Sequence, residues 1–306
     1  MSSKPPSPSR TASTSEYHHA LRPQTNRALR STAALTAITA GMAASLACLS
    51  PLLHSNLLLD PYSPAVPPGT PILRWTPGLL LASNFFSAVH VPTSLLIERY
   101  IYHQPTGSLS STSNHFRWNW LLKLAKRVVP TAIICGGLMQ LVKPAGWPQL
   151  SYRNVGMSLL TAFLMPWAAA AEEYIVRGLL QRITASWFVD RGTAFWVSTG
   201  ITSAFFAGIH MTTSVWMNAY CVLSSVSGSL MTRWTGGLEA SVLLHAVSNV
   251  VLMVPPMLAG NMGYLEDLTD KGPPGGMVVL AGLNVAVVTW VVRRAAKMEG
   301  EKEKEV

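Results

Sequence analysis

The chain has 306 residues, of which 49% are hydrophobic and 12% are charged, and its formal net charge is +9. A soluble domain carries roughly 25% charged residues, so this composition excludes an ordinary soluble protein and indicates a polytopic membrane protein. The positive charges lie mostly in the tails and in loops between apolar segments, which argues against a nucleic-acid partner. The lipid bilayer is therefore the expected surroundings of most of the chain.

Both ends of the chain are expected to be charged cytoplasmic tails. Residues 1–31 are rich in Ser, Pro and Thr, carry several Arg residues and contain no apolar core, which predicts a disordered basic tail and no signal peptide. Residues 293–306 end in a run of Lys and Glu and are expected to form a second, solvated tail. The region between them, residues 32–292, is the predicted transmembrane domain.

Apolar segments divide this domain into eight predicted membrane-spanning helices. A helix needs about 20 apolar residues to cross the bilayer, with a range of roughly 17 to 25. The third candidate is shorter than this range. The eight segments are approximately residues 32–53, 77–97, 128–142, 155–176, 193–213, 214–232, 238–259 and 276–292. The predicted fold is an all-α polytopic bundle of about eight transmembrane helices around a polar intramembrane cavity.

The distribution of Lys and Arg residues predicts the orientation of the bundle. If the amino terminus is cytoplasmic, most basic residues fall in cytoplasmic segments, as they do in most membrane proteins. The loops on the other side would carry Arg74, Lys143, Arg153 and Lys271. An even number of spans then places both termini in the cytoplasm.

The fourth predicted span contains two adjacent carboxylates and an arginine. Charged side chains inside a membrane are costly, so Glu172, Glu173 and Arg177 are expected to face a polar interior. Glu173 and Arg177 are i,i+4 neighbours and can neutralise each other, which also allows a purely structural ion pair. Glu172 is rotated about 100° from Glu173 and has no partner in its own helix. Glu172 is therefore the candidate general base, with Glu173 and Arg177 as its support.

Two later spans carry histidines at helical spacing from a second side chain. Phe206 and His210 lie one turn apart, and so do His245 and Asn249. His210 can polarise a water or accept a proton, whereas His245 and Asn249 can donate hydrogen bonds to a tetrahedral oxyanion. A base, a water, oxyanion donors and a dry pocket are what peptide hydrolysis without a covalent intermediate requires.

The predicted helix boundaries place the two histidines at different depths. Counting about 1.5 Å per residue from the expected cytoplasmic helix starts puts His210 roughly 25 Å deep and His245 roughly 10 Å deep. The two side chains must meet if both serve one water. Helix tilt, a fifth span that begins inside the protein or a boundary error of several residues would reconcile them.

These motifs resemble those of the CAAX prenyl protease and bacteriocin-processing (CPBP, also called ABI) family of intramembrane glutamate endopeptidases. The family pattern is EExxxR, FxxxH and HxxxN or HxxxD on separate transmembrane helices, and residues 172–177, 206–210 and 245–249 match it in order. The resemblance covers about residues 155–255. Residues 235–240 look more like prokaryotic members, which implies a prokaryotic plasma membrane.

The resemblance implies a role for each matched residue. Glu172 and His210 would activate water, His245 and Asn249 would form the oxyanion hole, and Glu173, Arg177 and Phe206 would support them. The implied activity is cleavage of a membrane-associated protein or peptide. A prenylated carboxyl-terminal substrate is allowed by the resemblance alone, since no residue here specifies a lipid.

Three alternatives remain open at this point. Glu172, Glu173, His210 and His245 could hold a divalent metal such as zinc, although the scheme requires no cofactor. Buried Glu, His and Arg side chains could also serve a proton-coupled transporter, against which the chain shows no obvious internal repeat. A non-catalytic membrane immunity or scaffold protein would keep the fold without using the site.

Overall fold

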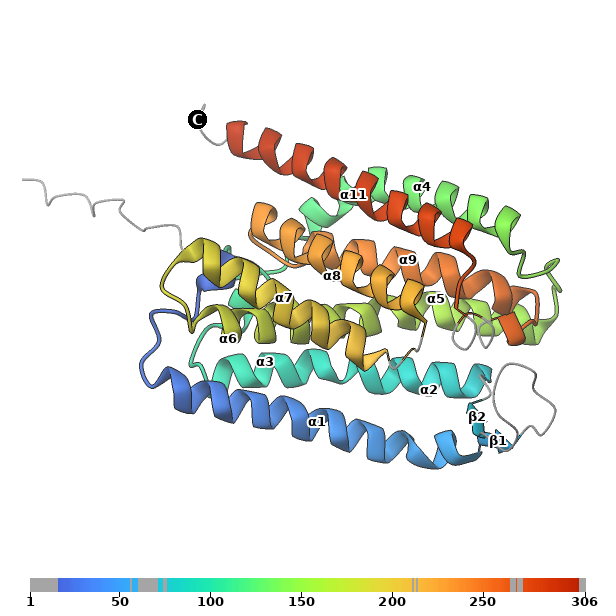
Figure 1. Ribbon diagram of the computed structural model, residues 1–306, viewed down its shortest axis with the longest axis horizontal. Coiled ribbons are helices and arrows are strands. Elements are labelled where there is room, and N and C mark those ends of the chain that lie inside the picture. Colours follow the sequence, from blue (N-terminus) through green and yellow to red (C-terminus); the bar gives the residue numbers. More distant parts are fainter. Residues whose placement is uncertain are drawn as a thin grey trace, which may run out of the picture.

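The computed structural model of the chain describes residues 16–55, 57–59, 71–73, 76–210, 212, 214–264, 268 and 272–302 (Figure 1). Its described helices form eight long rods that run side by side. Two rods are composite: α2 (Pro77–Ala88) leads into α3 (His90–Tyr100), and α5 (Tyr152–Glu173) continues through the π-helix η3 (Tyr174–Leu180) into α6 (Gln181–Ala185). The others are α1 (Arg27–Ser55), α4 (Trp118–Val142), α7 (Arg191–Ile209), α8 (Val215–Thr235), α9 (Glu239–Leu258) and α11 (Gly275–Lys302).

A short antiparallel ribbon is the only sheet formed by the described residues. Strands β1 (Leu57–Leu59) and β2 (Pro71–Leu73) pair between α1 and α2, with Leu58 opposite Ile72. The ribbon lies at the end of the bundle away from the start of α1 (Figure 1). All other long elements among the described residues are helices, so the predicted all-α class is confirmed.

The outer surface of the bundle is suited to lipid. Five described helical segments are long and apolar enough to cross a membrane, and they are Arg27–Ser55, Gly78–Tyr100, Tyr152–Ala185, Glu239–Leu258 and Gly275–Gly300. Large apolar side chains such as Ile134 and Phe163 are exposed on the rods, where acyl chains would cover them. The chain is a polytopic helical membrane protein. Helices α4, α7 and α8 occupy the positions of the other three predicted spans.

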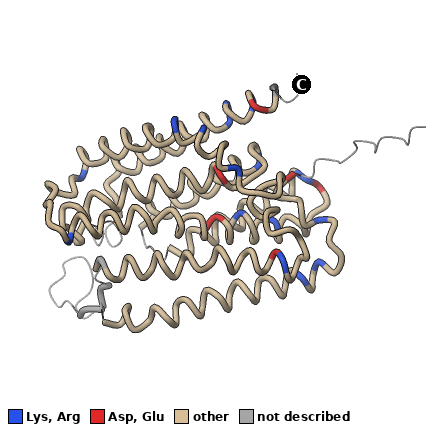
Figure 2. Tube along the Cα trace, turned by 180° about the vertical axis from the view of Figure 1, so that it is seen from behind, with Lys and Arg blue, Asp and Glu red and all other residues tan. Residues whose placement is uncertain are grey.

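Charged residues gather at one end of the bundle. Figure 2 shows most of the described Lys, Arg, Asp and Glu residues at this end. The same end holds the start of α1 and the end of α11 (Figure 1). The two ends of the described chain therefore lie at the same end of the bundle, on opposite sides of it, as an even number of membrane-spanning helices requires.

The amino-terminal segment differs from its prediction. Residues 1–15 lie outside the described residues, but Tyr17–His19 form a 3-10 helix, η1, and Tyr17, His18 and Leu21 are buried. The Tyr17 hydroxyl donates a hydrogen bond to the Leu109 carbonyl, and Arg22 donates one to the Ser186 carbonyl. The prediction of disorder is wrong for residues 16–31, because these side chains fill space beside α6 and α7 and α1 begins at Arg27.

Two other boundaries also move. Helix α4 begins ten residues before the predicted start of the third span, at Trp118, and this makes it 25 residues long. The basic residues of its first turns lie near the charged end of the bundle (Figure 2), and long basic side chains at such a position can reach water while the helix continues into the bundle. Helix α11 runs on to Lys302, so the predicted tail from residue 293 is largely helical, and residues 303–306 lie outside the described residues.

Helices α5 and α9 form the most extensive helix pair of the bundle. Helix α5 also packs on α2, and α9 packs on α4 and α8. Helix α7 joins this group through its contacts with η3 and α8. The first predicted motif lies at the junction of α5 and η3, the second at the end of α7, and the third near the middle of α9.

Candidate active site

The first motif forms a buried ion pair at the junction of α5 and η3. Arg177 Nη1 donates a hydrogen bond of 2.8 Å to Glu173 Oε1, and the two residues are 1% and 2% exposed. The predicted i,i+4 contact is therefore present. A buried pair of this kind is costly to break, because either partner alone would be an uncompensated charge in an apolar environment.

The helix that carries this pair is locally widened. Residues Tyr174–Leu180 form a π-helix directly after Glu173, and all seven are buried. Short π-helical turns within α-helices often occur at functional sites. The predicted span ended near residue 176, and no residue type in this stretch specifies the wider turn or its continuation into α6.

His245 connects α9 to both glutamates. Its Nδ1 lies 3.0 Å from Glu173 Oε1, and its Nε2 lies 3.6 Å from Glu172 Oε2. Because a carboxylate can only accept, the hydrogen on Nδ1 points to Glu173. The ring nitrogen that faces Glu172 is therefore Nε2. The first and third motifs, 72 residues apart along the chain, form one hydrogen-bonded unit.

Phe206 lies between this unit and His210. The Phe206 ring is 4.7 Å from the His210 ring and 5.6 Å from the His245 ring, and the Arg177 guanidinium carbon is 5.0 Å from its centroid. His210 Nδ1 is 2.7 Å from the Phe206 carbonyl oxygen, which can only accept. The hydrogen of a neutral His210 ring is therefore on Nδ1, which makes Nε2 the acceptor, and the ring also interacts with the Cys221 thiol of α8.

The two histidines are brought to one place because α9 begins inside the protein. Its start is covered by the segment before α4: the Thr112 amide donates to the Gly236 carbonyl at 2.8 Å, and the Leu238 amide donates to the Ser110 carbonyl at 2.9 Å. Leu238 and Glu239 are fully buried. The predicted depth of His245 assumed that α9 begins at the surface of the bundle, whereas its first residues are covered by the segment before α4.

Most of the predicted site residues line one cavity of about 150 Å³. Helix α8 supplies much of the opposite wall, including Tyr220 and Ser224, which sequence reasoning did not single out. The predicted residues that line it are Glu173, Arg177, Phe206, His210, His245 and Asn249. We call this space the catalytic cavity.

Glu172 faces a different space. It lines a cavity of about 280 Å³ between α1, α2, α5 and α7, together with His90 and Ser45. The Glu172 side chain is 28% exposed, and its Oε2 makes no hydrogen bond with another described residue. Glu172 and His245 thus stand between the two cavities.

Gly228 on α8 allows the arginine of the first motif to fit. A Cβ at this position would lie 3.0 Å from Arg177 Nη2 and 3.2 Å from its Cζ. Gly228 therefore lets α8 approach the guanidinium closely, and a larger residue here would displace it.

Metal binding has no geometric support in the described part of the chain. No group of three or more His, Cys, Asp or Glu side chains there is arranged to hold a metal ion. The acidic and imidazole groups of the site instead contact Arg177 and one another.

Comparison with known proteins agrees with the motifs. Residues 154–251, about a third of the chain, match the family model of Type II CAAX prenyl endopeptidases, Rce1-like. The matched segment runs from α5 to α9 and includes every residue of the predicted site, so the resemblance to this group of intramembrane proteases is confirmed for that region. No curated protein matches the chain. No solved structure matches it.

Proposed function

We propose that the protein is an intramembrane glutamate endopeptidase that hydrolyses a peptide bond of a membrane-associated protein or peptide. The observation that carries this proposal is the contact of His245 with both glutamates in a unit that shares Phe206 with His210. A structural ion pair needs only Glu173 and Arg177. The additional convergence of two imidazoles and a second carboxylate supplies the groups of general acid–base chemistry.

Water activation falls to Glu172 and His210. His210 presents Nε2 as a hydrogen-bond acceptor, because Nδ1 is engaged with the Phe206 carbonyl. Glu172 accepts the proton as the water oxygen attacks the substrate carbonyl carbon. Its Oε2 makes no hydrogen bond with a described residue and lies 3.6 Å from His245 Nε2, so a rotation of this side chain toward the catalytic cavity gives up only that longer contact.

Stabilisation of the oxyanion falls to His245 and Asn249. Both side chains line the catalytic cavity, one helical turn apart on α9. Donation from His245 Nε2 requires the imidazolium form, and the carboxylates of Glu172 and Glu173 lie where they balance its charge. When the tetrahedral intermediate collapses, the carbon–nitrogen bond breaks and the proton held by Glu172 passes to the leaving amine. The enzyme returns to its starting state after one water is consumed.

The substrate must reach this site from the membrane. The Glu172 cavity lies between α1, α2 and α7, which gives an extended peptide a place beside the carboxylate. A separate apolar cavity of about 590 Å³ on the α4 side, lined by Trp118, Phe163 and Trp167 among others, is large enough for a lipid chain. We therefore include a prenylated substrate within the proposal. The excess of basic residues at the charged end also supports a cytoplasmic position for that end. A prokaryotic plasma membrane is proposed from the resemblance of residues 235–240 to prokaryotic members of the family.

The experiment that tests this function compares protein termini in host membranes that carry the wild type or Glu172→Gln. Glu299→Gln is the matched control, because Glu299 lies on α11, where it pairs with Lys123 at the charged end of the bundle. We expect new termini with the wild type and with Glu299→Gln, but not with Glu172→Gln, at equal expression.

Each result has a defined meaning. Termini that depend on Glu172 would support the protease and name its substrate. Termini that are the same with all three proteins, in a host that supplies CAAX-type and other membrane substrates, would overturn it in favour of a scaffold or a transporter. Flux that depends on a pH gradient and on the same glutamate would identify the transporter.

A further inference from the structure

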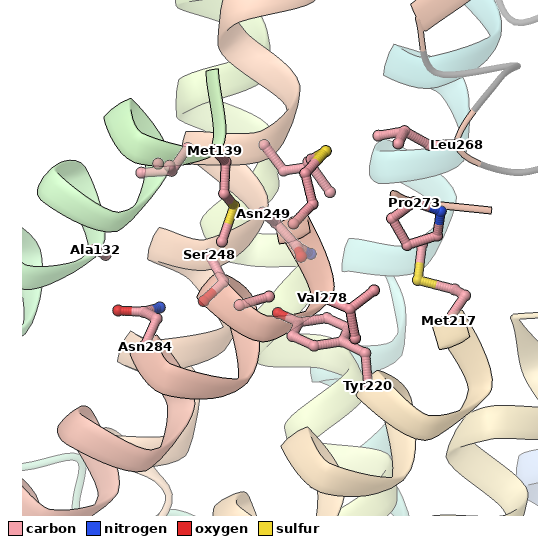
Figure 3. A pocket seen from close by; sticks show the side chains of 15 residues that line it. Ala132, Met139, Met217, Tyr220, Ser248, Asn249, Leu268, Pro273, Val278 and Asn284 are labelled. Atoms are coloured by element: carbon pink, nitrogen blue, oxygen red, sulfur yellow. The ribbon is translucent and has the colours of Figure 1, made fainter. Parts of the chain in front are cut away.

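A second cavity adjoins the catalytic cavity on its far side from Glu172. It lies between α4, α8, α9 and α11 and has a volume of about 80 Å³ (Figure 3). Met217, Tyr220, Ser248, Asn249 and Leu252 line both cavities. The two spaces therefore meet along one wall, and the candidate oxyanion donor Asn249 is part of that wall.

Polar side chains converge on this second cavity from three helices. Figure 3 shows Tyr220 of α8, Ser248 and Asn249 of α9, and Asn284 of α11 around it. Asn284 is 5% exposed, although it lies in an apolar helix that is long enough to cross the membrane. Asn284 Oδ1 is buried and makes no hydrogen bond with another described residue, and the Ser248 hydroxyl interacts with the Tyr220 hydroxyl across the cavity wall. An unpaired group such as Asn284 Oδ1 is costly in an apolar environment unless water or a ligand satisfies it.

The remainder of the lining is apolar and reaches the loop between α9 and α11. Met139 and Met277 lie on the α4 and α11 walls, and Leu268 and Pro273 of the loop line the outer part. The volume is well above the roughly 10–15 Å³ that one water needs. The cavity thus combines enough room, several hydrogen-bonding groups and a position that extends from a loop to the catalytic cavity.

We propose that this cavity is a water reservoir that supplies the hydrolytic water to the catalytic cavity. This inference rests on the proposed function, because peptide hydrolysis consumes one water for each bond that is cut. Water enters beside the α9–α11 loop, is held by Asn284 and Ser248, and passes the shared wall at Tyr220 and Asn249. The polar groups of this cavity give water a route to the catalytic cavity on the side away from Glu172.

Methionines at matched burial give a direct test. Met277 lines the reservoir and is 3% exposed, whereas Met165 belongs to the same apolar cluster, is 4% exposed and does not line it. X-ray radiolysis converts cavity water to hydroxyl radicals that oxidise adjacent methionines. In the full-length protein in nanodiscs, we expect Met277 to be oxidised faster than Met165.

Asn284→Leu should abolish this difference, because it removes the polar group and fills the space. Thr289→Val is the matched control on α11, since the Thr289 hydroxyl bonds to the Val285 carbonyl of its own helix. We expect Met277 oxidation to fall to the rate of Met165 in Asn284→Leu and to stay at the wild-type rate in Thr289→Val. If Asn284→Leu does not fold, Ser248→Ala should lower the Met277 rate with a smaller change in volume.

The outcomes separate this inference from the proposed function, because oxidation needs no turnover. Equal rates for Met277 and Met165 in the wild type would overturn the reservoir, whatever the terminal-peptide experiment shows. An unchanged Met277 rate in Asn284→Leu, together with altered cleavage sites, would overturn it in favour of a pocket for a substrate side chain. A fast Met277 that slows in Asn284→Leu supports the reservoir even if the protease activity fails its own test.

Discussion

Two of the carboxylate–arginine pairs in the bundle, Arg117–Glu239 and Arg177–Glu173, differ in how completely they are hydrogen-bonded. At the start of α9, Glu239 accepts from the Arg117 amide and Nε through one oxygen and from Arg117 Nη2 through the other, at 2.8, 2.9 and 2.8 Å. At the end of α5, Glu173 Oε1 accepts from both Arg177 and His245, whereas Arg177 Nε makes no hydrogen bond with a described residue. Both carboxylates are buried.

The surroundings of the two pairs explain this difference. A Cβ at Gly237 would collide with the Glu239 carboxylate, so that pair is enclosed by backbone. The Glu173 pair instead opens onto the catalytic cavity, beside two imidazoles. Burial of charge in a membrane protein therefore does not by itself mark an active site. Hydrogen-bonding capacity that is left unused and faces a cavity is the more specific sign.

The largest expected effect comes from removal of the proposed base. Glu172→Gln should lower the turnover of a substrate identified as above by about 10²–10⁴-fold, the range for loss of general acid–base catalysis. The thermal unfolding of the protein should change little, because Glu172 Oε2 makes no hydrogen bond with a described residue. Turnover within a few-fold of wild type would remove Glu172 from the mechanism.

Disruption of the enclosed Arg117–Glu239 pair should lower stability, whereas Glu172→Gln should lower turnover. Arg117→Ala leaves the Glu239 carboxylate buried without its partner and should lower the free energy of unfolding by about 3–5 kcal/mol, toward the lower value because Arg117 is 24% exposed. Lys123→Ala removes the exposed pair with Glu299 and should cost less than about 1 kcal/mol. Denaturant titration in detergent measures both. Equal losses in the free energy of unfolding for Arg117→Ala and Lys123→Ala would mean that enclosure of the Arg117–Glu239 pair adds nothing to its stability.

A smaller effect is expected where α8 contacts Arg177. Gly228→Ala forces the guanidinium to move, and overpacking of this kind costs about 1–3 kcal/mol, less any gain in helix propensity of up to about 1 kcal/mol. Turnover should also fall, because Arg177 donates a hydrogen bond to Glu173 and its displacement would move that carboxylate. Gly200→Ala on α7 is the control, because its Cβ would meet no atom within 4 Å. The same response to both changes would show that the Arg177 contact is irrelevant.

The smallest effect concerns a buried polar group far from the catalytic cavity. Burial lowers the pKa of His18 to about 4, and Glu16 opposes this shift. The unfolded segment therefore binds more protons than the docked one below pH 6.5, so docking is strongest above that pH and is lost as the pH falls toward 4. Hydrogen exchange of residues 16–22 should be faster at pH 4.5 than at pH 7 after correction for the intrinsic rate.

Two variants check this assignment. His18→Gln should remove the pH dependence of exchange in this segment, whereas His54→Gln, at the exposed far end of α1, should leave it unchanged. Protection that is the same at both pH values in the wild type would show that His18 does not control docking.

Local spacing in the sequence determined several features of this protein. The apolar segments and sparse charges predicted the all-α membrane bundle, and the i,i+4 spacing of Glu173 and Arg177 predicted their ion pair. Phe206 with His210, and His245 with Asn249, were predicted to share helical faces, and the structure places all four on one cavity. These features follow from helix geometry and from the cost of charge in lipid, which act within a single segment.

Only the tertiary structure decided which helices meet and which groups remain unsatisfied. The contact of His245 with both glutamates, the π-helix after Glu173, the position of Glu172 on a separate cavity and the fit of Arg177 against Gly228 all depend on contacts between helices. The docking of residues 16–31 has the same origin, because polar segments can be buried when neighbouring helices offer partners for their backbone and side chains. Sequence spacing carries no information about such partners, since they lie tens of residues away along the chain.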